Sequence, residues 1–486
     1  MNHMHITLIN PNNVTQKGDF FGTGIPYMPI TLAYLASCLR NSHEISVIDA
    51  FGENPFKKRT KDNFIIQGLN TKDIIKRINP KTGLIFLYAG HIVEHIVIKE
   101  IIKEIKRKLN TKIAIIENSQ AVTAYSLVKA KEEFFSSGAD IIIYGEPEKT
   151  ALELIACIKK NKEPSNVKGI IYKKNNKIKT NKKQEYIKDL DKLPFPAWDL
   201  FPIKNYWKLH YAHAPMKQNY LPLLTSRGCP FQCEFCIIPT TNEKRWRFRT
   251  ARNVVDEITE FSKRYNIKEF HIEDLNPTIN KKRIKDICKL IIKKKLNIKT
   301  KFASGIKLET IDKETLALLA KSGCNYLSFS PESGSKKMLE LMKKPFNHNH
   351  GISMTKEMNR LGIKSQACFV LGFPGETSKD LKLTKDYIIR LTKAGVDEIA
   401  LFIMTPIPGS KVYESWETKD LSKLTFSPTW RKEYKKLHNL RKKLYILFFI
   451  HKLLNHPLKT LKQPINIILK KFETKMEMTI YRRIKV

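Results

Sequence analysis

The sequence has few of the features that mark secreted, fibrous or membrane-spanning proteins. It has only eight cysteines in 486 residues, five of them widely scattered, so it lacks the disulfide framework of a secreted domain. Its N-terminus lacks the basic segment and long apolar stretch of a signal peptide. No apolar stretch reaches the roughly 18 residues of a spanning helix, because His451 and Lys452 interrupt LYILFFIHKLL. These absences predict a cytoplasmic globular protein.

Acidic residues are also scarce, since 47 Asp and Glu stand against 87 Lys and Arg and leave a net charge of +40. Such an excess attracts polyanions and anionic lipid. Lysine is spread along the whole chain, however, so a general bias towards lysine explains the charge equally well. The length predicts about three domains.

Short apolar runs alternate with amphipathic stretches through residues 1–160. HITLIN, EISVIDA, GLIFLYA, KIAIIEN and DIIIYGE are typical of buried parallel strands, and the segments between them have helical spacing. The pattern predicts an α/β fold with a doubly wound, Rossmann-like parallel sheet. Ligands of such sheets bind beyond the carboxyl ends of the strands. The candidate binding residues there are Asn10, Pro11, Asp49, Ala89, Gly90, Gly145 and Glu146. Each of them is alternatively an ordinary turn residue.

Three further regions follow. Residues 161–215 contain a polar, hairpin-like piece and a segment rich in proline and aromatics, which predicts a linker. Residues 216–420 resume the alternation with six strand-like runs, which predicts a partial TIM-type (β/α)6 barrel. Residues 421–486 carry 17 Lys and Arg against three Glu and predict a basic helical region. This region is either a solvated cap or a contact for an anionic membrane surface or a phosphate-bearing substrate.

Three cysteines crowd into one short loop directly after the first strand of the second domain. Cys229, Cys233 and Cys236 have the spacing C-x-x-x-C-x-x-C, and no fourth cysteine follows nearby. Three thiolates can hold three irons of a 4Fe-4S cluster and leave the fourth iron open for a substrate or cofactor. A structural zinc site is the alternative, and it would need His210 or His213 as a further ligand.

This loop, with the aromatic Phe235 before its last cysteine, resembles the signature of the radical S-adenosylmethionine (SAM) superfamily, and the similarity extends over about residues 195–415. The resemblance implies that the open iron binds the amino and carboxylate groups of SAM. It also implies that the cluster, reduced by a donor such as flavodoxin or ferredoxin, cleaves SAM to a 5′-deoxyadenosyl radical. The cofactor then supplies the difficult chemistry and the protein orients it.

The same resemblance implies further residues of the SAM site. Glu273 and Asp274 match the position that contacts the SAM amino group, and Lys307 stands where many relatives have Arg. The other matching residues are Ser330, Glu332, Ser333 and Ser335 in SFSPESGS, Gly372, Gly375 and Glu376 in VLGFPGET, and Pro406, Pro408 and Gly409 in TPIPGS. For Glu332, pairing with a nearby lysine is the alternative role.

The first domain and the connecting segment LDKLPFPAWDLFP resemble the cobalamin-binding branch of the superfamily. In that branch the doubly wound domain holds cobalamin against the barrel. The chain departs from the branch at one turn, because Glu117, Asn118, Ser119 and Gln120 replace a glycine-rich turn. It also lacks the D-x-H-x-x-G motif, so no histidine is marked as a cobalt ligand.

These features predict a cobalamin-dependent radical SAM methyltransferase that acts on an unactivated centre of a small-molecule or lipid-like substrate. Anaerobic ring closure or oxidation is the alternative within the family. A methylthiotransferase is disfavoured because only Cys38 and Cys157 lie in the N-terminal region. A nucleic-acid binder with a structural cluster is a non-enzymatic alternative, but no RNA-binding module is present, so no specific nucleic-acid partner is expected. Peripheral contact with the inner surface of an anionic membrane is a further hypothesis.

Overall fold

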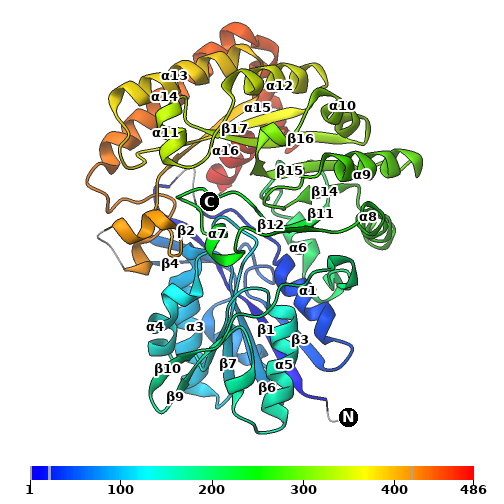
Figure 1. Cartoon of the computed structure of the whole chain (residues 1–486), viewed down its shortest axis with the longest axis vertical. Coiled ribbons are helices and arrows are strands. Elements are labelled where there is room, and N and C mark those ends of the chain that lie inside the picture. Colours follow the sequence, from blue (N-terminus) through cyan, green and yellow to red (C-terminus); the bar gives the residue numbers. More distant parts are fainter. Residues whose placement is uncertain (1–2, 20–22, 417–419, 486) are drawn as a thin grey trace.

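The computed structural model describes residues 3–19, 23–416 and 420–485. Two sheets lie one above the other along the long axis of the molecule, with the N-terminal sheet in the lower half of Figure 1 and the second sheet in the upper half. The C-terminal helices, orange to red in Figure 1, lie against the upper half. No helix among the described residues is both long and apolar enough to cross a bilayer.

The N-terminal sheet has seven strands in the order β10-β9-β8-β7-β6-β1-β3. Its parallel strands are β1 (His5–Asn10), β3 (Glu44–Asp49), β6 (Thr82–Ala89), β7 (Lys112–Glu117) and β8 (Ile141–Ile143). The helices between them are α1 (Ile30–Leu39), α2 (Thr71–Arg77), α3 (His95–Lys108) and α4 (Leu127–Ser137), and α5 (Pro147–Lys159) follows β8. Apolar runs such as III in β8 are buried because helices cover the sheet. The predicted doubly wound sheet is confirmed.

The sheet extends beyond residue 160, where the sequence predicts a linker. A hairpin of β9 (Ile170–Lys174) and β10 (Lys177–Thr180) continues it antiparallel to β8. Ile170, Ile171 and Tyr172 are buried, so their side chains belong to the core of the first domain. The predicted boundaries of 1–160 and 161–215 therefore place this hairpin outside the sheet that it completes. The local sequence is mostly polar because the end of β9, the turn and most of β10 are exposed.

The second sheet has six parallel strands whose order in space follows the sequence, β11-β14-β15-β16-β17-β18. They are β11 (Tyr220–Leu223), β14 (Glu269–Ile272), β15 (Lys299–Ile306), β16 (Cys324–Glu332), β17 (Lys364–Leu371) and β18 (Glu398–Ile403). The helices between them are α8 (Ala251–Tyr265), α9 (Lys281–Lys293), α10 (Lys313–Lys321), α11 (Lys336–Leu341), α12 (His348–Arg360) and α13 (Ser378–Lys393). The edge strands β11 and β18 are not paired with each other in the described chain, so the predicted partial barrel is confirmed.

Two small sheets have no counterpart among the predicted strands. One is antiparallel and joins β2 (Asn13–Gln16), β5 (Phe64–Gln67) and β4 (Lys58–Lys61). The other pairs β12 (Ser226–Gly228) with β13 (Trp246–Phe248), on either side of the cysteine loop and the short helix α7 (Ile238–Thr241). These strands of three or four residues are too short for a recognisable alternation of apolar and polar residues.

The C-terminal region is helical, as predicted, with α14 (Tyr434–Asn455), α15 (Pro457–Ile468) and α16 (Lys475–Lys485). Helix α14 packs against α13 and β18, whereas α16 turns back towards the middle of the molecule (Figure 1). The region therefore completes the second domain on one side.

A buried ion-pair network joins the two halves of the molecule. Arg227 in β12 donates to Glu148 (2.7 Å) and to Glu146 (3.3 Å) at the start of α5. Arg247 in β13 also pairs with Glu146 at 2.7 Å. The Arg227 side chain is 6% exposed, so its charge is compensated almost entirely by these two carboxylates. This network fixes β12, and with it the cysteine loop, to the N-terminal sheet.

Replacing Arg227 by alanine should strongly destabilise the protein, because Glu146 and Glu148 would lose a buried partner. We expect a loss of about 3–5 kcal/mol in the free energy of unfolding, measured by denaturant titration. Arg252→Ala is the control, since that side chain is 90% exposed and should change stability by less than about 0.5 kcal/mol. Similar unfolding midpoints for R227A and R252A would refute the role assigned to the network.

Candidate functional site

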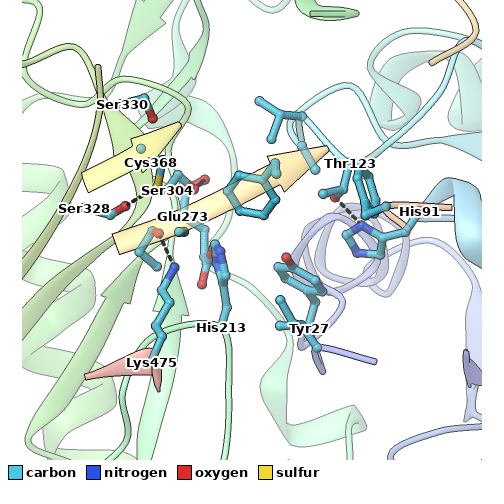
Figure 2. Close-up of a pocket in the computed structure, with 18 of the residues that line it drawn as sticks. Tyr27, His91, Thr123, His213, Glu273, Ser304, Ser328, Ser330, Cys368 and Lys475 are labelled. Atoms are coloured by element: carbon cyan, nitrogen blue, oxygen red, sulfur yellow. Dashed lines mark hydrogen bonds and ion pairs between the residues drawn. The ribbon is translucent and has the colours of Figure 1, made fainter. Parts of the chain in front are cut away.

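A cavity of about 730 Å³ lies between the carboxyl ends of the two sheets. One wall consists of residues from the N-terminal sheet and its loops, and the opposite wall consists of the cysteine loop and the ends of β14, β15 and β16. Helix α16 contributes a third wall. Figure 2 shows side chains from both domains facing one another across this space.

The cysteine loop is held in place at its start and in its middle. At its start, the Gly228 N–H donates to Gln120 Oε1 (3.1 Å), and Gly228 has a φ of +81° where a Cβ would meet the Arg245 carbonyl at 2.1 Å. In its middle, Glu234 donates to the Met342 carbonyl (3.0 Å) and accepts from the Val412 N–H (3.2 Å). Cys229, Cys233 and Cys236 all line the cavity.

The charges around the three thiols suit an anionic cluster. Burial raises the pKa of Cys229 to about 11 and also raises the pKa values of Cys233 and Cys236, whereas Lys344 lowers all three. Lys307 lies 5.2 Å above the ring of Phe231 in the same loop, and Lys344 lies 5.8 Å above Phe235. Two cations therefore compensate the charge that thiolate ligation introduces.

A closed zinc site is not assembled around these thiols. No group of three or more His, Cys, Asp or Glu side chains in the described ranges has a metal-binding arrangement. His213 forms a close pair with Glu273, and His210 does not line the cavity. Among the described residues, the donor set that this loop brings to the cavity is three soft thiols, which match the irons of a 4Fe-4S cluster.

Glu273 and Asp274 face opposite directions although both follow β14. Glu273 lines the cavity and lies 2.5 Å from His213 Nδ1. Burial by itself would raise the pKa of Glu273, but the contact with His213 outweighs burial, so the pKa lies below its usual range. Asp274 accepts from the Thr225 N–H and hydroxyl (both 2.7 Å) and from Ser226 (2.5 Å). Asp274 therefore positions the strand before the cysteine loop, and only Glu273 faces the cavity.

The end of β16 brings Ser330 and Glu332 to the cavity. Glu332 pairs with Lys344, which is the alternative role that the sequence offered for Glu332. The pair lies beside the cysteine loop. Glu332 has a φ of +63°, which is uncommon for a residue other than glycine. Ser333 and Ser335 do not line the cavity, and Ser335 instead caps α11 and donates to Asp380 (2.6 Å).

Gly372, Gly375 and Glu376 do not line the cavity, in contrast to their predicted role. Glu376 accepts from the Gly372 N–H (2.6 Å), and Arg431 donates to the Gly372 carbonyl (3.0 Å). A Cβ on Gly372 would meet Leu437 at 2.4 Å. The C-terminal region thus covers this turn, and Val370 and Met404 line the cavity instead.

The predicted residues of the first domain divide in the same way. Asn10 and Pro11 line the cavity, whereas Asp49, Ala89, Gly90, Gly145 and Glu146 do not. Asp49 accepts from Asn10 Nδ2 and Tyr206 (both 2.8 Å), Gly145 donates to Glu117 (2.7 Å), and Glu146 belongs to the Arg227 network. These hydrogen bonds and ion pairs hold the edge of the sheet together. Of the bonded pair Asn10 and Asp49, only Asn10 lines the cavity.

Several cavity residues have no sequence signal of their own. Tyr27 stacks on His91 with ring centroids 4.3 Å apart and lies 4.8 Å from His213 (Figure 2). His91 Nδ1 hydrogen bonds with Thr123 (2.6 Å), and burial lowers the pKa of His91 to about 3. His91 directly follows Gly90, which the sequence predicted as a binding residue, so its position at the end of a strand could have identified it.

Helix α16 brings cationic side chains into the cavity from the far end of the chain. Glu398 of β18 accepts from the backbone N–H groups of Lys475 (3.0 Å) and Met476 (2.7 Å) and so fixes the start of this helix. Lys475 Nζ donates to the Ala303 carbonyl at 2.8 Å (Figure 2), and Arg482 also lines the cavity. No sequence pattern links these residues to the barrel, because only the fold brings α16 back.

Comparison with known proteins agrees with this geometry. Residues 223–388 match the radical SAM superfamily model, and this range includes the cysteine loop and β14 to β17. Residues 223–388 form a radical SAM domain. The chain is a radical SAM enzyme, and the family implies a 4Fe-4S cluster and SAM as its cofactors.

Three similar proteins extend the likeness beyond the radical SAM domain. An uncharacterized methyltransferase of Pyrococcus horikoshii is 27% identical over 89% of this chain and 86% of its own length. The cytidylyl-2-hydroxyethylphosphonate methyltransferase of Streptomyces wedmorensis is 26% identical over 84% of this chain and 81% of its own. The structure of the radical SAM methyltransferase TsrM from Kitasatospora setae, with cobalamin and a 4Fe-4S cluster bound, superposes with a TM-score of 0.64 at 15% identity over 84% of this chain and 74% of that one.

Substituting Glu273 and Asp274 separately should distinguish their roles in this radical SAM site. Glu273→Gln should reduce 5′-deoxyadenosine formation at limiting SAM by about ten-fold or more, because a carboxylate facing the SAM ammonium is lost, while the cluster absorbance stays unchanged. Asp274→Asn should instead lower the thermal unfolding temperature. If E273Q cleaves SAM like the unmodified enzyme across the SAM titration, Glu273 does not bind SAM.

A second prediction concerns Glu94, which lines the cavity and accepts from the His91 N–H (3.0 Å). Burial raises the pKa of Glu94 from 4.5 to about 8. Between these values the folded protein retains a proton that the unfolded chain releases, so stability falls as the pH rises, by up to about 1.4 kcal/mol per pH unit.

Glu94→Gln should remove this dependence. We expect denaturant unfolding of the cofactor-free protein to show a flatter stability profile for E94Q than for the unmodified protein between about pH 5 and pH 8. Glu132→Gln is the control, because Glu132 is 68% exposed and should leave the profile unchanged. Parallel profiles for E94Q and the unmodified protein would show that Glu94 ionises normally.

Proposed function

We propose that this chain is a cobalamin-dependent radical SAM methyltransferase whose substrate is an anionic small molecule. The observation that carries the proposal is the single cavity that joins the cysteine loop to the carboxyl edge of the Rossmann-like sheet. A cluster site alone needs only the barrel. A cavity shared by both domains provides room for a second cofactor beside the first, and two relatives that align over more than four-fifths of the chain are named methyltransferases.

The residues of the barrel side divide the work of binding SAM and the cluster. Cys229, Cys233 and Cys236 would hold the cluster, which supplies the electron that cleaves SAM. Glu273 is charged and faces the cavity, so it is placed to accept hydrogen bonds from the SAM ammonium. Lys307 is placed to attract the SAM carboxylate. A reduced flavodoxin or ferredoxin is the expected electron donor.

The opposite wall has groups suited to cobalamin, which would supply the methyl group. The stacked rings of Tyr27 and His91 offer a flat aromatic surface, and Asn10 and Thr123 add polar groups. The turn of residues 117–120 has no glycines because it serves another purpose: Glu117 accepts from Leu127 (2.9 Å), and Asn118 donates to the Gly90 carbonyl (3.1 Å). Cobalamin would therefore be approached by side chains at this turn.

Cations from α16 support an anionic substrate. Burial lowers the pKa of Lys475, and that of Arg482 to about 10, so Arg482 stays charged at neutral pH. The nearby carboxylates are engaged, since Glu273 is assigned to the SAM ammonium and Glu398 caps α16. A phosphate, phosphonate or carboxylate group of the substrate would compensate this local excess of positive charge.

Anaerobic reconstitution with iron, sulfide and cobalamin tests the proposed function. With a strong reductant, the protein should cleave SAM to 5′-deoxyadenosine and retain cobalamin through gel filtration. Methyl transfer to a substrate should then yield S-adenosylhomocysteine together with 5′-deoxyadenosine, because two SAM molecules are consumed per product. Ring closure or oxidation would yield no S-adenosylhomocysteine.

Matched cysteine variants control this experiment. Cys229→Ala should abolish both the cluster absorbance and SAM cleavage, whereas Cys157→Ala, on α5 outside the cavity, should change neither. Intact SAM under reductant would refute the radical SAM assignment, and loss of all cobalamin on gel filtration would refute the second cofactor.

A further inference from the structure

Helix α15 has the reverse of the usual polarity of a helix on a folded protein. Four of its apolar side chains, Leu458, Leu461, Ile465 and Ile468, point outward, and their exposed fractions range from 55% for Ile465 to 82% for Leu458. Its one buried residue is polar, since Asn466 lies in the interior and donates to Glu477 (3.0 Å). A helix that packs on a soluble core normally buries the apolar stripe and exposes the polar one.

The end of α14 shows the same inversion. Lys452 points inward and donates to the Asp397 carbonyl (2.6 Å), while Ile450 and Leu454 on either side of it are 51% and 74% exposed. Lys459 of α15 also points inward and lies 3.0 Å from Asp397 Oδ1. These polar contacts fix the orientation of both helices, so the outward apolar face is part of the folded state.

We define the outer face of α14 and α15 as the set of exposed apolar residues Ile446, Ile450, Leu453, Leu454, Leu458, Leu461, Ile465, Ile468 and Leu469. Leu458, Leu461, Ile465 and Ile468 are spaced three or four residues apart and so share one side of α15. Contiguous exposed apolar surface on a soluble protein marks an interaction site.

The segment that carries the outer face has charges of one sign. Residues 434–472 contain ten Lys and Arg and no Asp or Glu. Lys435, Lys436, Lys442 and Lys443 are exposed on α14, and Lys470 and Lys471 follow α15. Lys442 follows Lys435 by seven residues and precedes Ile446 by four, so positively charged side chains lie along the side of α14 that continues into its apolar end.

We propose that the outer face of α14 and α15 docks the enzyme onto an anionic lipid bilayer. The apolar side chains would enter the boundary between headgroups and acyl chains, and the lysines would contact the lipid phosphates. A second copy of this chain is a poorer partner, because a symmetric contact would bring the same lysines face to face without any acidic residue from this segment. The proposal does not depend on the reaction that the cavity catalyses.

Vesicle flotation with the full, reconstituted chain tests the proposal. The protein should float with vesicles of phosphatidylglycerol and phosphatidylcholine and remain unbound with phosphatidylcholine alone. Replacing Leu458, Leu461 and Ile465 together by serine should lower the bound fraction by about ten-fold or more. These side chains are exposed and lie outside the cavity, so the triple variant should fold and cleave SAM normally.

Two further variants separate the contributions. The matched control replaces the exposed Phe56 and Leu152 of the first domain by serine and should leave flotation unchanged. Replacing Lys435, Lys436, Lys442 and Lys443 by glutamine should weaken binding to the anionic vesicles.

Three results would overturn the proposal. One is undiminished flotation of the triple serine variant, and another is equal binding to neutral vesicles. The third is a dimer of the unmodified protein that dissociates in the triple variant without any vesicle binding, which would assign the outer face to a second copy. Failure of SAM cleavage would leave this test intact, because flotation requires no catalysis.

Discussion

The whole site depends on holding the cysteine loop at the meeting point of two independent sheets. Each sheet is stable through its own buried strands, so neither sheet by itself determines where the other one lies. The buried charge of Arg227 supplies the missing constraint, because its two carboxylate partners start a helix of the N-terminal domain. Gln120, which accepts from Gly228, adds a neutral hydrogen bond beside it. Arg227, Glu146 and Glu148 do not line the cavity themselves, but their ion pairs fix the two walls of the cavity relative to each other.

A third constraint comes from the C-terminal helix α16. Its first backbone N–H groups would be unsatisfied at the edge of the barrel, and Glu398 at the start of β18 accepts from two of them. This carboxylate also accepts from Tyr326 of β16 (2.7 Å), so Glu398 of β18 connects β16 to the start of α16. The result is that Lys475, nearly at the end of the chain, donates to the Ala303 carbonyl of β15 and lines the cavity.

The sequence predicted those features that depend on local pattern. Continuous apolar runs identify eleven of the strands because the sheets are buried on both faces, and three cysteines in one loop identify the cluster site. Glu273 and Asp274 could not be told apart, since adjacent residues after a strand differ only in which hydrogen bonds the fold provides. Gly372 and Lys475 could not be placed, because their positions depend on a C-terminal region that packs far from its place in the sequence.

The net positive charge indicates a binding surface only when the burial of individual side chains is also known. A net charge of +40 is equally compatible with a lysine-rich composition and with an anionic partner. Burial separates the two at the end of α14 and in α15, because Lys452 and Lys459 are used for internal contacts to the loop before β18 while Leu453, Leu454, Leu458 and Leu461 face solvent. A bias towards lysine would place lysines outside and leucines inside. The opposite arrangement costs hydrophobic free energy in water, and that cost is recovered only when an apolar phase covers the leucines.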